Sequence, residues 1–158
     1  MIFILLLGLS ACKKIDFVNN INDAGNAGTG LTGIWNNDVK YGDNINRSSY
    51  QFNTDSTVIL TQSVLNSIYN TLGYTYQLKA KYSLNGSSLR LYALTAYGIQ
   101  NNSAPYTALK NLVPMPTSSQ STVNIQFSED KSSFTLIYPS CPANANCIGS
   151  SGPYIKQQ

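Results

Sequence analysis

Short stretches in which apolar and polar residues alternate cover most of the chain after residue 30. They are rich in Tyr, Thr, Val, Ile and Phe, and turn-forming Asn, Gly, Asp and Ser residues separate them. Alternation with a period of two is typical of strands that bury one face. We therefore predict strands at 31–35, 50–52, 57–61, 74–84, 88–97, 122–127 and 134–138.

Two hairpins can be given a register from the sequence. Asn85-Gly86 is a strong signal for a two-residue turn, and a turn there places Tyr82 opposite Leu89 and Leu78 opposite Ala93. The second hairpin turns at Asp130-Lys131. It aligns one apolar row with another: Val123, Ile125 and Phe127 against Phe134, Leu136 and Tyr138.

Two segments do not follow the strand pattern. Leu65, Ile68, Tyr69 and Leu72 have helical spacing, although residues 64–71 also fit an irregular strand. One or two helical turns are predicted within residues 106–113, inside a long connection from 98 to 121. That connection is either a lid or binding loop or an insertion without fixed structure.

The predicted fold class is all-β: an antiparallel up-and-down β-barrel of about seven or eight strands, with one or two short helical turns. A barrel is favoured because it leaves no open sheet edge. Gly33-Ile34-Trp35 resembles the Gly-x-Trp motif of lipocalins and of bacterial lipocalin-like lipoproteins, and Leu31-Thr32-Gly33 resembles the Leu-x-Gly before it. This resemblance implies a lipocalin-like barrel over residues 31–138. In lipocalins an Arg on the last strand packs over the indole, and the last predicted strand, 134–138, contains no Arg.

The first eleven residues, MIFILLLGLSA, are too short to span a bilayer and are typical of a signal peptide. Leu9-Ser10-Ala11-Cys12 resembles the lipobox of bacterial lipoproteins. That resemblance implies removal of residues 1–11, acylation of Cys12, and attachment to the membrane of the bacterial cell envelope, which we expect to be the outer membrane. No Lys or Arg precedes the apolar run, so we expect the signal to extend upstream of Met1.

The expected organisation of the mature chain has two parts. Residues 12–30 form a lipid-anchored flexible linker, and residues 31–158 form a single β-barrel domain with a C-terminal disulfide loop. Lipid on Cys12 leaves Cys141 and Cys147 as the remaining pair in an oxidising compartment, so we expect them to form a disulfide.

Composition excludes several function classes. The chain has 158 residues, with 10 Lys and Arg, 7 Asp and Glu, and no His. The absence of His removes the Ser-His-Asp and Cys-His catalytic arrangements and the common zinc and iron sites. The net charge of +3 is not gathered into a basic face, so we predict no nucleic-acid partner. The adjacent carboxylates Glu129 and Asp130 are assigned to a turn, and we expect no enzymatic activity, cofactor or metal site.

Aromatic residues are the remaining functional signal, because 11 of the 158 residues are Tyr. A small barrel is either filled by side chains or holds one small ligand, and both alternatives remain open. We expect binding of a small amphipathic or aromatic ligand. The alternative is an adhesin-like or inhibitor-like module that binds a protein through Tyr- and Asn-rich loops. The candidate ligand-lining residues are Trp35, Tyr50, Tyr76, Tyr82, Leu91, Phe127 and Tyr138.

Overall fold

The computed structural model describes residues 30–100, 104–138 and 151–158. The predicted signal peptide, most of the predicted linker with Cys12, and the predicted disulfide of Cys141 and Cys147 lie outside these ranges and stay predictions. The elements of the described residues are β1 (Gly33–Tyr41), β2 (Asn44–Phe52), β3 (Thr57–Asn66), β4 (Thr71–Asn85), β5 (Ser88–Gly98), the 3₁₀ helix η2 (Leu109–Asn111), β6 (Val113–Met115), β7 (Gln120–Phe127), β8 (Ser133–Ile137) and β9 (Tyr154–Lys156).

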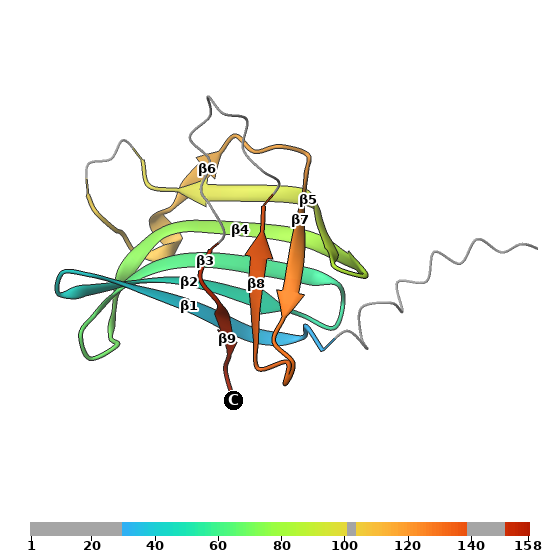
Figure 1. The fold of residues 1–158 in the computed structure, drawn as a ribbon. Coiled ribbons are helices and arrows are strands. Elements are labelled where there is room, and N and C mark those ends of the chain that lie inside the picture. The colour runs from blue at the N-terminus through green and yellow to red at the C-terminus, as the bar shows by residue number, and fades with distance from the viewer. Residues whose placement is uncertain (1–29, 101–103, 139–150) are drawn as a thin grey trace, which may run out of the picture.

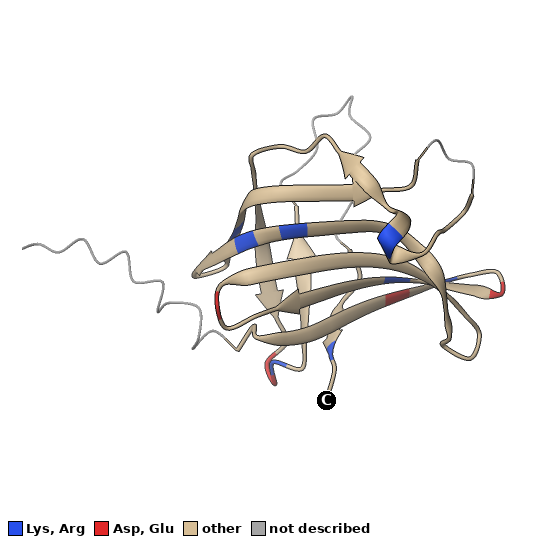
Figure 2. Ribbon diagram, turned by 180° about the vertical axis from the view of Figure 1, so that it is seen from behind, with Lys and Arg blue, Asp and Glu red and all other residues tan. Residues whose placement is uncertain are grey.

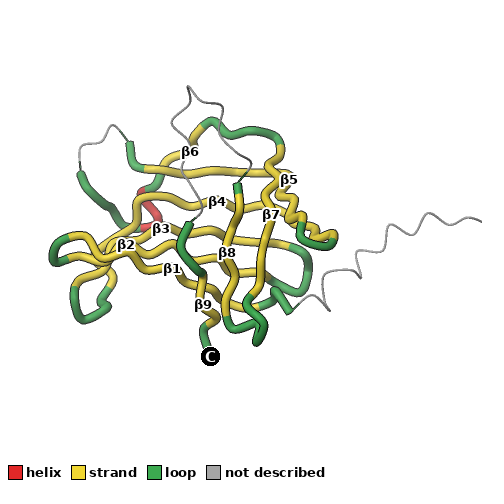
Figure 3. The backbone as a smooth tube through the Cα atoms, in the orientation of Figure 1, coloured by secondary structure: helices red, strands yellow, loops and turns green. Residues whose placement is uncertain are grey.

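Eight strands form a closed antiparallel ring in the order β1, β2, β3, β4, β5, β7, β8, β9 and back to β1. Strands that follow one another in the ring also follow one another along the chain, except that the short β6 comes between β5 and β7. β6 lies outside the ring and pairs only with the end of β5. In Figure 1, β1 to β5 form one wall, and β7, β8 and β9 run steeply across it. Strands joined by turns make up almost all of the described chain (Figure 3). The predicted all-β antiparallel barrel is confirmed.

The core is a cluster of aromatic rings with aliphatic side chains around it. Trp35 is fully buried, its ring centroid lies 5.0 Å from that of Phe134, and its Nε1–H donates a hydrogen bond of 2.6 Å to the Leu31 carbonyl. Phe134 also contacts the rings of Tyr50, Phe52, Phe127 and Tyr154. No charged side chain is buried among the described residues, and Lys, Arg, Asp and Glu are spread over strands and turns (Figure 2).

The register of the first predicted hairpin is wrong by two residues. Asn85 pairs with Ser88, so the turn is centred on Gly86-Ser87, and Tyr82 faces Leu91 instead of Leu89. Gly86 has a φ of +57°, which suits a two-residue hairpin turn with glycine as the first of its two central residues. A shift of two residues preserves the face of every side chain, so the predicted apolar face survives the error.

A β-bulge in β5 overturns the predicted pairing of Leu78 with Ala93. Ala93 has a φ of +53° and is exposed, and the register shift around it brings Ala96 opposite Leu78. An extra residue in one strand turns all following side chains to the other face. The core therefore receives Ala96 from this part of β5 and not Ala93.

The turn and two of the three apolar pairs of the second predicted hairpin are confirmed, whereas the expected pair of Val123 with Tyr138 lies beyond the end of β8 at Ile137. Phe127 pairs with Phe134 and Ile125 pairs with Leu136. The Asp130 carboxylate accepts hydrogen bonds from the hydroxyls of Ser128 and Ser132 and from the Ser132 amide. The prediction that Asp130 lies in a turn is therefore correct.

Of the two alternatives for the segment with Leu65, Ile68, Tyr69 and Leu72, the helix is wrong, and strand residues flank a turn. β3 ends at Asn66, and the following turn leaves Ile68 71% and Tyr69 58% exposed. The Asn66 side-chain oxygen accepts hydrogen bonds from the backbone amides of Ile68 and Asn70, which stabilises a turn where helical bonds would be needed. In the 106–113 segment one turn of 3₁₀ helix does form, as η2.

The last strand of the barrel lies in the C-terminal part that the sequence analysis assigned to a disulfide loop. β9 pairs with both β1 and β8 and closes the ring. Lys156 on β9 is the direct neighbour of Trp35 across the strand pair, and its Nζ lies 5.1 Å from the indole centroid. The last strand therefore places a cation over the indole of Trp35.

Candidate functional site at the open end of the barrel

A cavity of about 730 Å³ lies at the end of the barrel where β1 turns into β2. Its described lining consists of Tyr41, Asn44, Asn46, Arg47, Ser48, Gln62, Ser63, Val64, Thr75, Pro105 and Tyr106. Most of these side chains carry an amide or a hydroxyl group. Cavities of about 300–1,000 Å³ are the usual size for small-molecule sites.

The pairing of β2 with β3 builds one wall of the cavity. Side chains two residues apart on a strand share a face, and on β2 this face runs from Asn44, Asn46 and Ser48 at the open end to Tyr50 and Phe52 in the core. On β3, Gln62 pairs with Ser48 and Val64 pairs with Asn46. The same strands therefore present a polar wall at the open end and an aromatic core further inside.

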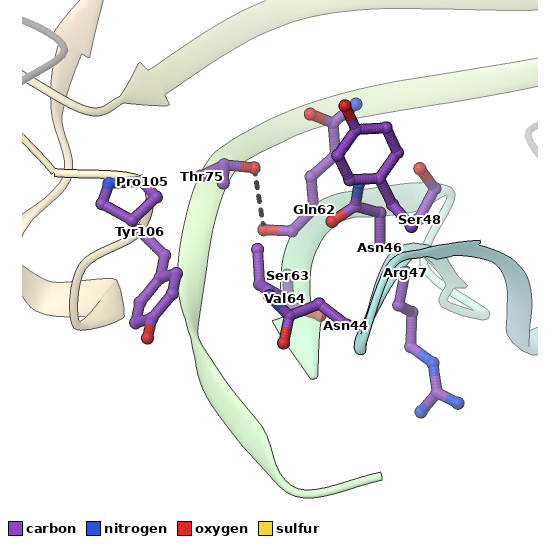
Figure 4. A pocket seen from close by; sticks show the side chains of 11 residues that line it. Asn44, Asn46, Arg47, Ser48, Gln62, Ser63, Val64, Thr75, Pro105 and Tyr106 are labelled. Atoms are coloured by element: carbon purple, nitrogen blue, oxygen red, sulfur yellow. Dashed lines mark hydrogen bonds between the residues drawn. The ribbon is translucent and has the colours of Figure 1, made fainter. Parts of the chain in front are cut away.

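The opposite side of the cavity comes from the segment that follows β5. Thr107 exchanges two backbone hydrogen bonds with Tyr74 on β4, which fixes this segment at the open end. Gly73 makes the approach possible, because a Cβ atom there would lie 2.6 Å from the Tyr106 ring. Figure 4 shows the side chains of Asn46, Gln62 and Ser48 grouped together, with Pro105 and Tyr106 on the other side.

Arg47 is the single charged residue in the described lining, and Asp38 neutralises it. Its Nε and terminal nitrogen donate to the two Asp38 carboxylate oxygens, each at 2.7 Å. The Tyr69 ring lies 5.6 Å from the guanidinium, and Figure 4 shows the guanidinium directed away from Asn46 and Gln62. The hydrogen bonds that Arg47 donates to Asp38 raise the pKa of Arg47 above its usual value, so the guanidinium stays charged.

Four tyrosines, Tyr50, Tyr76, Tyr138 and Tyr154, form a group next to this wall, here named the tyrosine cluster. Burial raises the pKa of Tyr50 well above its ordinary value of 10.0, and the other three tyrosines raise it further. Burial likewise raises the pKa of Tyr154, an effect that the Ser151 and Ser48 hydroxyls partly oppose. Tyr76 is directly opposite Gln62. Ser48 and Gln62 therefore border both the cavity and the tyrosine cluster.

The raised tyrosine pKa values predict a loss of stability in alkaline solution. The folded protein holds the phenolic protons more tightly than the unfolded chain, so this contribution is complete below pH 10.0 and disappears as the pH rises through the folded-state pKa values. Denaturant unfolding measured from about pH 9 upward should show this decline. Tyr50→Phe should weaken it, whereas Tyr41→Phe, at a residue that is 78% exposed, should leave it unchanged. If the free energy of unfolding depended on pH equally in the wild type and both variants, the alkaline loss of stability could not come from Tyr50.

The seven residues predicted to line a ligand do not border this cavity. Four belong to the buried core, Trp35, Tyr50, Tyr82 and Leu91, and two pack against it, Tyr76 and Phe127. The seventh, Tyr138, is 41% exposed. Three of the seven meet in the tyrosine cluster, which adjoins the cavity.

The polar residues that form the cavity lie outside the strands predicted from the sequence. The first predicted strand ends at residue 35 and the second begins at residue 50, whereas β1 continues to Tyr41 and β2 starts at Asn44. The alternation Asn44, Asn46, Ser48 before Tyr50 was the available signal. Asn residues are uncommon in strands, which concealed it.

Comparison of the chain with models of protein families, with characterised proteins and with solved structures finds no match. In the described parts of the chain, no helix has the length and apolar character needed to cross a membrane. No group of three or more Cys, Asp or Glu residues suited to a metal ion occurs among the described residues.

Proposed function

We propose that this protein is a non-enzymatic binding protein of the bacterial cell envelope that holds a small polar or amphipathic ligand at the open end of its barrel. The observation that carries the proposal is the cavity of about 730 Å³. Its position at a barrel opening is one of the places where protein folds commonly bind small molecules.

The chemistry of the lining supports binding over catalysis. The described lining contains amides, hydroxyls and one arginine that is already paired with Asp38. It offers no carboxylate, thiol or amine in these ranges to act as a general base or nucleophile. Hydrogen-bonding groups beside tyrosine rings are suited to orienting a ligand.

Blocking the cavity should abolish binding without unfolding the protein. The fluorophore 1-aminoanthracene is small, uncharged near neutral pH and amphipathic, and we expect the purified protein to bind it close to one-to-one. Gln62→Trp places a large ring at an exposed position in the cavity wall, so affinity should fall at least tenfold while the melting temperature is kept. Gln126→Trp is the matched control, because Gln126 is exposed on β7 and outside the described lining. Equal affinities in both variants would show that the probe binds elsewhere.

The location in the envelope rests on the lipobox resemblance at Cys12. Several acyl chains together give stable membrane attachment, whereas one chain gives only marginal binding. Mass spectrometry of protein isolated from membranes should find the acyl groups on Cys12, and Cys12→Ser should release the protein or leave it unprocessed. A Cys12→Ser protein that is still processed and remains with the membrane fraction would refute lipidation at this residue.

A further inference from the structure

The cavity wall is made of groups that can both donate and accept hydrogen bonds. Asn44, Asn46 and Gln62 present amides, each with an NH₂ donor and a carbonyl acceptor, and Ser48 and Thr75 present hydroxyls. No described residue forms a hydrogen bond with the side chains of Asn44, Asn46 or Gln62. These amides are therefore free to bind a ligand that offers donors and acceptors on neighbouring atoms.

The charge of the site disfavours an anionic or cationic ligand. Both Asp38 carboxylate oxygens accept hydrogen bonds from Arg47, so the two opposite charges compensate each other. In Figure 4 the guanidinium extends away from the amides that form the wall. A charged ligand entering between Asn46 and Tyr106 would lose hydration without meeting an opposite charge, which is costly.

A purely apolar ligand is disfavoured for a different reason. It would remove water from Asn44, Asn46 and Gln62, all of which are exposed, and would leave their amides without partners. Each buried amide without a partner costs about 1–3 kcal/mol. A site built to form hydrogen bonds therefore rejects ligands that cannot form them.

Two tyrosine rings complete the site. Tyr41, at the end of β1, is 78% exposed, and Tyr106 packs beside Gly73 across the cavity from the amide wall. Tyrosine combines a flat apolar ring with a polar hydroxyl and loses little conformational freedom on binding. Such a ring can cover the C–H face of a sugar while amides bind its hydroxyl groups.

We propose, on the basis of the function proposed above, that the ligand is an uncharged oligosaccharide bound between the amide wall of β2 and β3 and the Tyr41 and Tyr106 rings. The cavity volume of about 730 Å³ suits a short oligosaccharide. Asn46 and Gln62 bind hydroxyl groups on adjacent ring carbons, because each amide can donate to one hydroxyl and accept from the next.

The test uses the purified protein with four types of neutral sugar, one anionic sugar and one fluorophore. The neutral sugars are dimers and trimers of glucose, of galactose, of mannose and of N-acetylglucosamine, trigalacturonate is the anionic counterpart, and 1-aminoanthracene is the amphipathic probe that is not a sugar. We expect at least one neutral sugar to bind. Asn46→Ala and Gln62→Ala should each weaken that binding about tenfold, the effect of losing roughly 1.4 kcal/mol. Asn124→Ala should have no effect, because Asn124 is exposed on β7 outside the described lining.

The outcomes separate this inference from the proposed function. If no neutral sugar binds but 1-aminoanthracene still binds and remains sensitive to Gln62→Trp, the saccharide class is wrong and the ligand-binding function stands. If neither the sugars nor the fluorophore bind, both proposals fail. Tighter binding of trigalacturonate than of every neutral sugar would overturn the uncharged class. Sugar binding that is unaffected by Asn46→Ala and Gln62→Ala would overturn the site.

Discussion

Replacing Trp35 with Ala is expected to lower the free energy of unfolding by about 3–5 kcal/mol. The side chain is fully buried, its ring contacts those of Phe127 and Phe134, and its Nε1–H donates to the Leu31 carbonyl. The substitution removes the ring contacts and leaves a cavity in the aromatic core. Because Trp35 is the only tryptophan of the chain, denaturant unfolding should be followed by circular dichroism.

Two further variants divide the effect of Trp35 into packing and polar contributions. Trp35→Phe keeps a ring in the core but removes the indole N–H that donates to the Leu31 carbonyl, so a loss smaller than that of Trp35→Ala is expected, with about 0.5–1.5 kcal/mol of it from the hydrogen bond. Lys156→Met keeps an apolar stem but removes the charge over the indole, which should cost about 0.5–1 kcal/mol. A Trp35→Ala protein within about 1 kcal/mol of the wild type would contradict the central place of Trp35 in the core.

Removing residues 153–158 is expected to open the barrel. The deletion takes away β9, which pairs with β1 on one side and β8 on the other, and with it the Tyr154 ring, which stacks on Phe134 at 5.0 Å. Loss of the ring alone should cost about 3–5 kcal/mol. The exposed edges of β1 and β8 should also promote self-association. Denaturant unfolding and light scattering would measure the two effects.

Two point variants separate loss of the ring from loss of the strand. Tyr154→Ala removes the buried ring, which is 5% exposed, but keeps the backbone of β9, so it should destabilise the protein without making it associate. Ile155→Ala is the matched control, because Ile155 is 49% exposed on the same strand, and it should change little. A truncated protein that stays monomeric and unfolds at the wild-type midpoint would contradict the role of β9 in closing the ring.

The sequence by itself determined the fold class and the apolar face of most strands. Alternation is a local property, because each side chain points to the face opposite that of its neighbour. The hairpin with Ile125 opposite Leu136 followed from that rule and from its turn residues. In the first hairpin the rule still assigned Tyr82, Leu89 and Leu91 to the core although the register was wrong by two.

Features that depend on partners distant in sequence were decided only by the tertiary structure. β9 has three residues, too few for alternation to be visible. It is a strand because its backbone pairs with the otherwise open edges of β1 and β8. The bulge at Ala93 and the packing of Lys156 over Trp35 likewise depend on how the sheet curves and closes.

The candidate site belongs to this second group. Asn44, Asn46 and Ser48 lie between the strands that alternation predicts at 31–35 and 50–52, and they become strand residues because β2 pairs with β1 and β3 along its full length. The cavity also needs Tyr106, which lies at the open end through the pairing of Thr107 with Tyr74 and the space left by Gly73. Alternation gives the direction of each side chain, whereas the volume left between side chains depends on the closure of the whole ring.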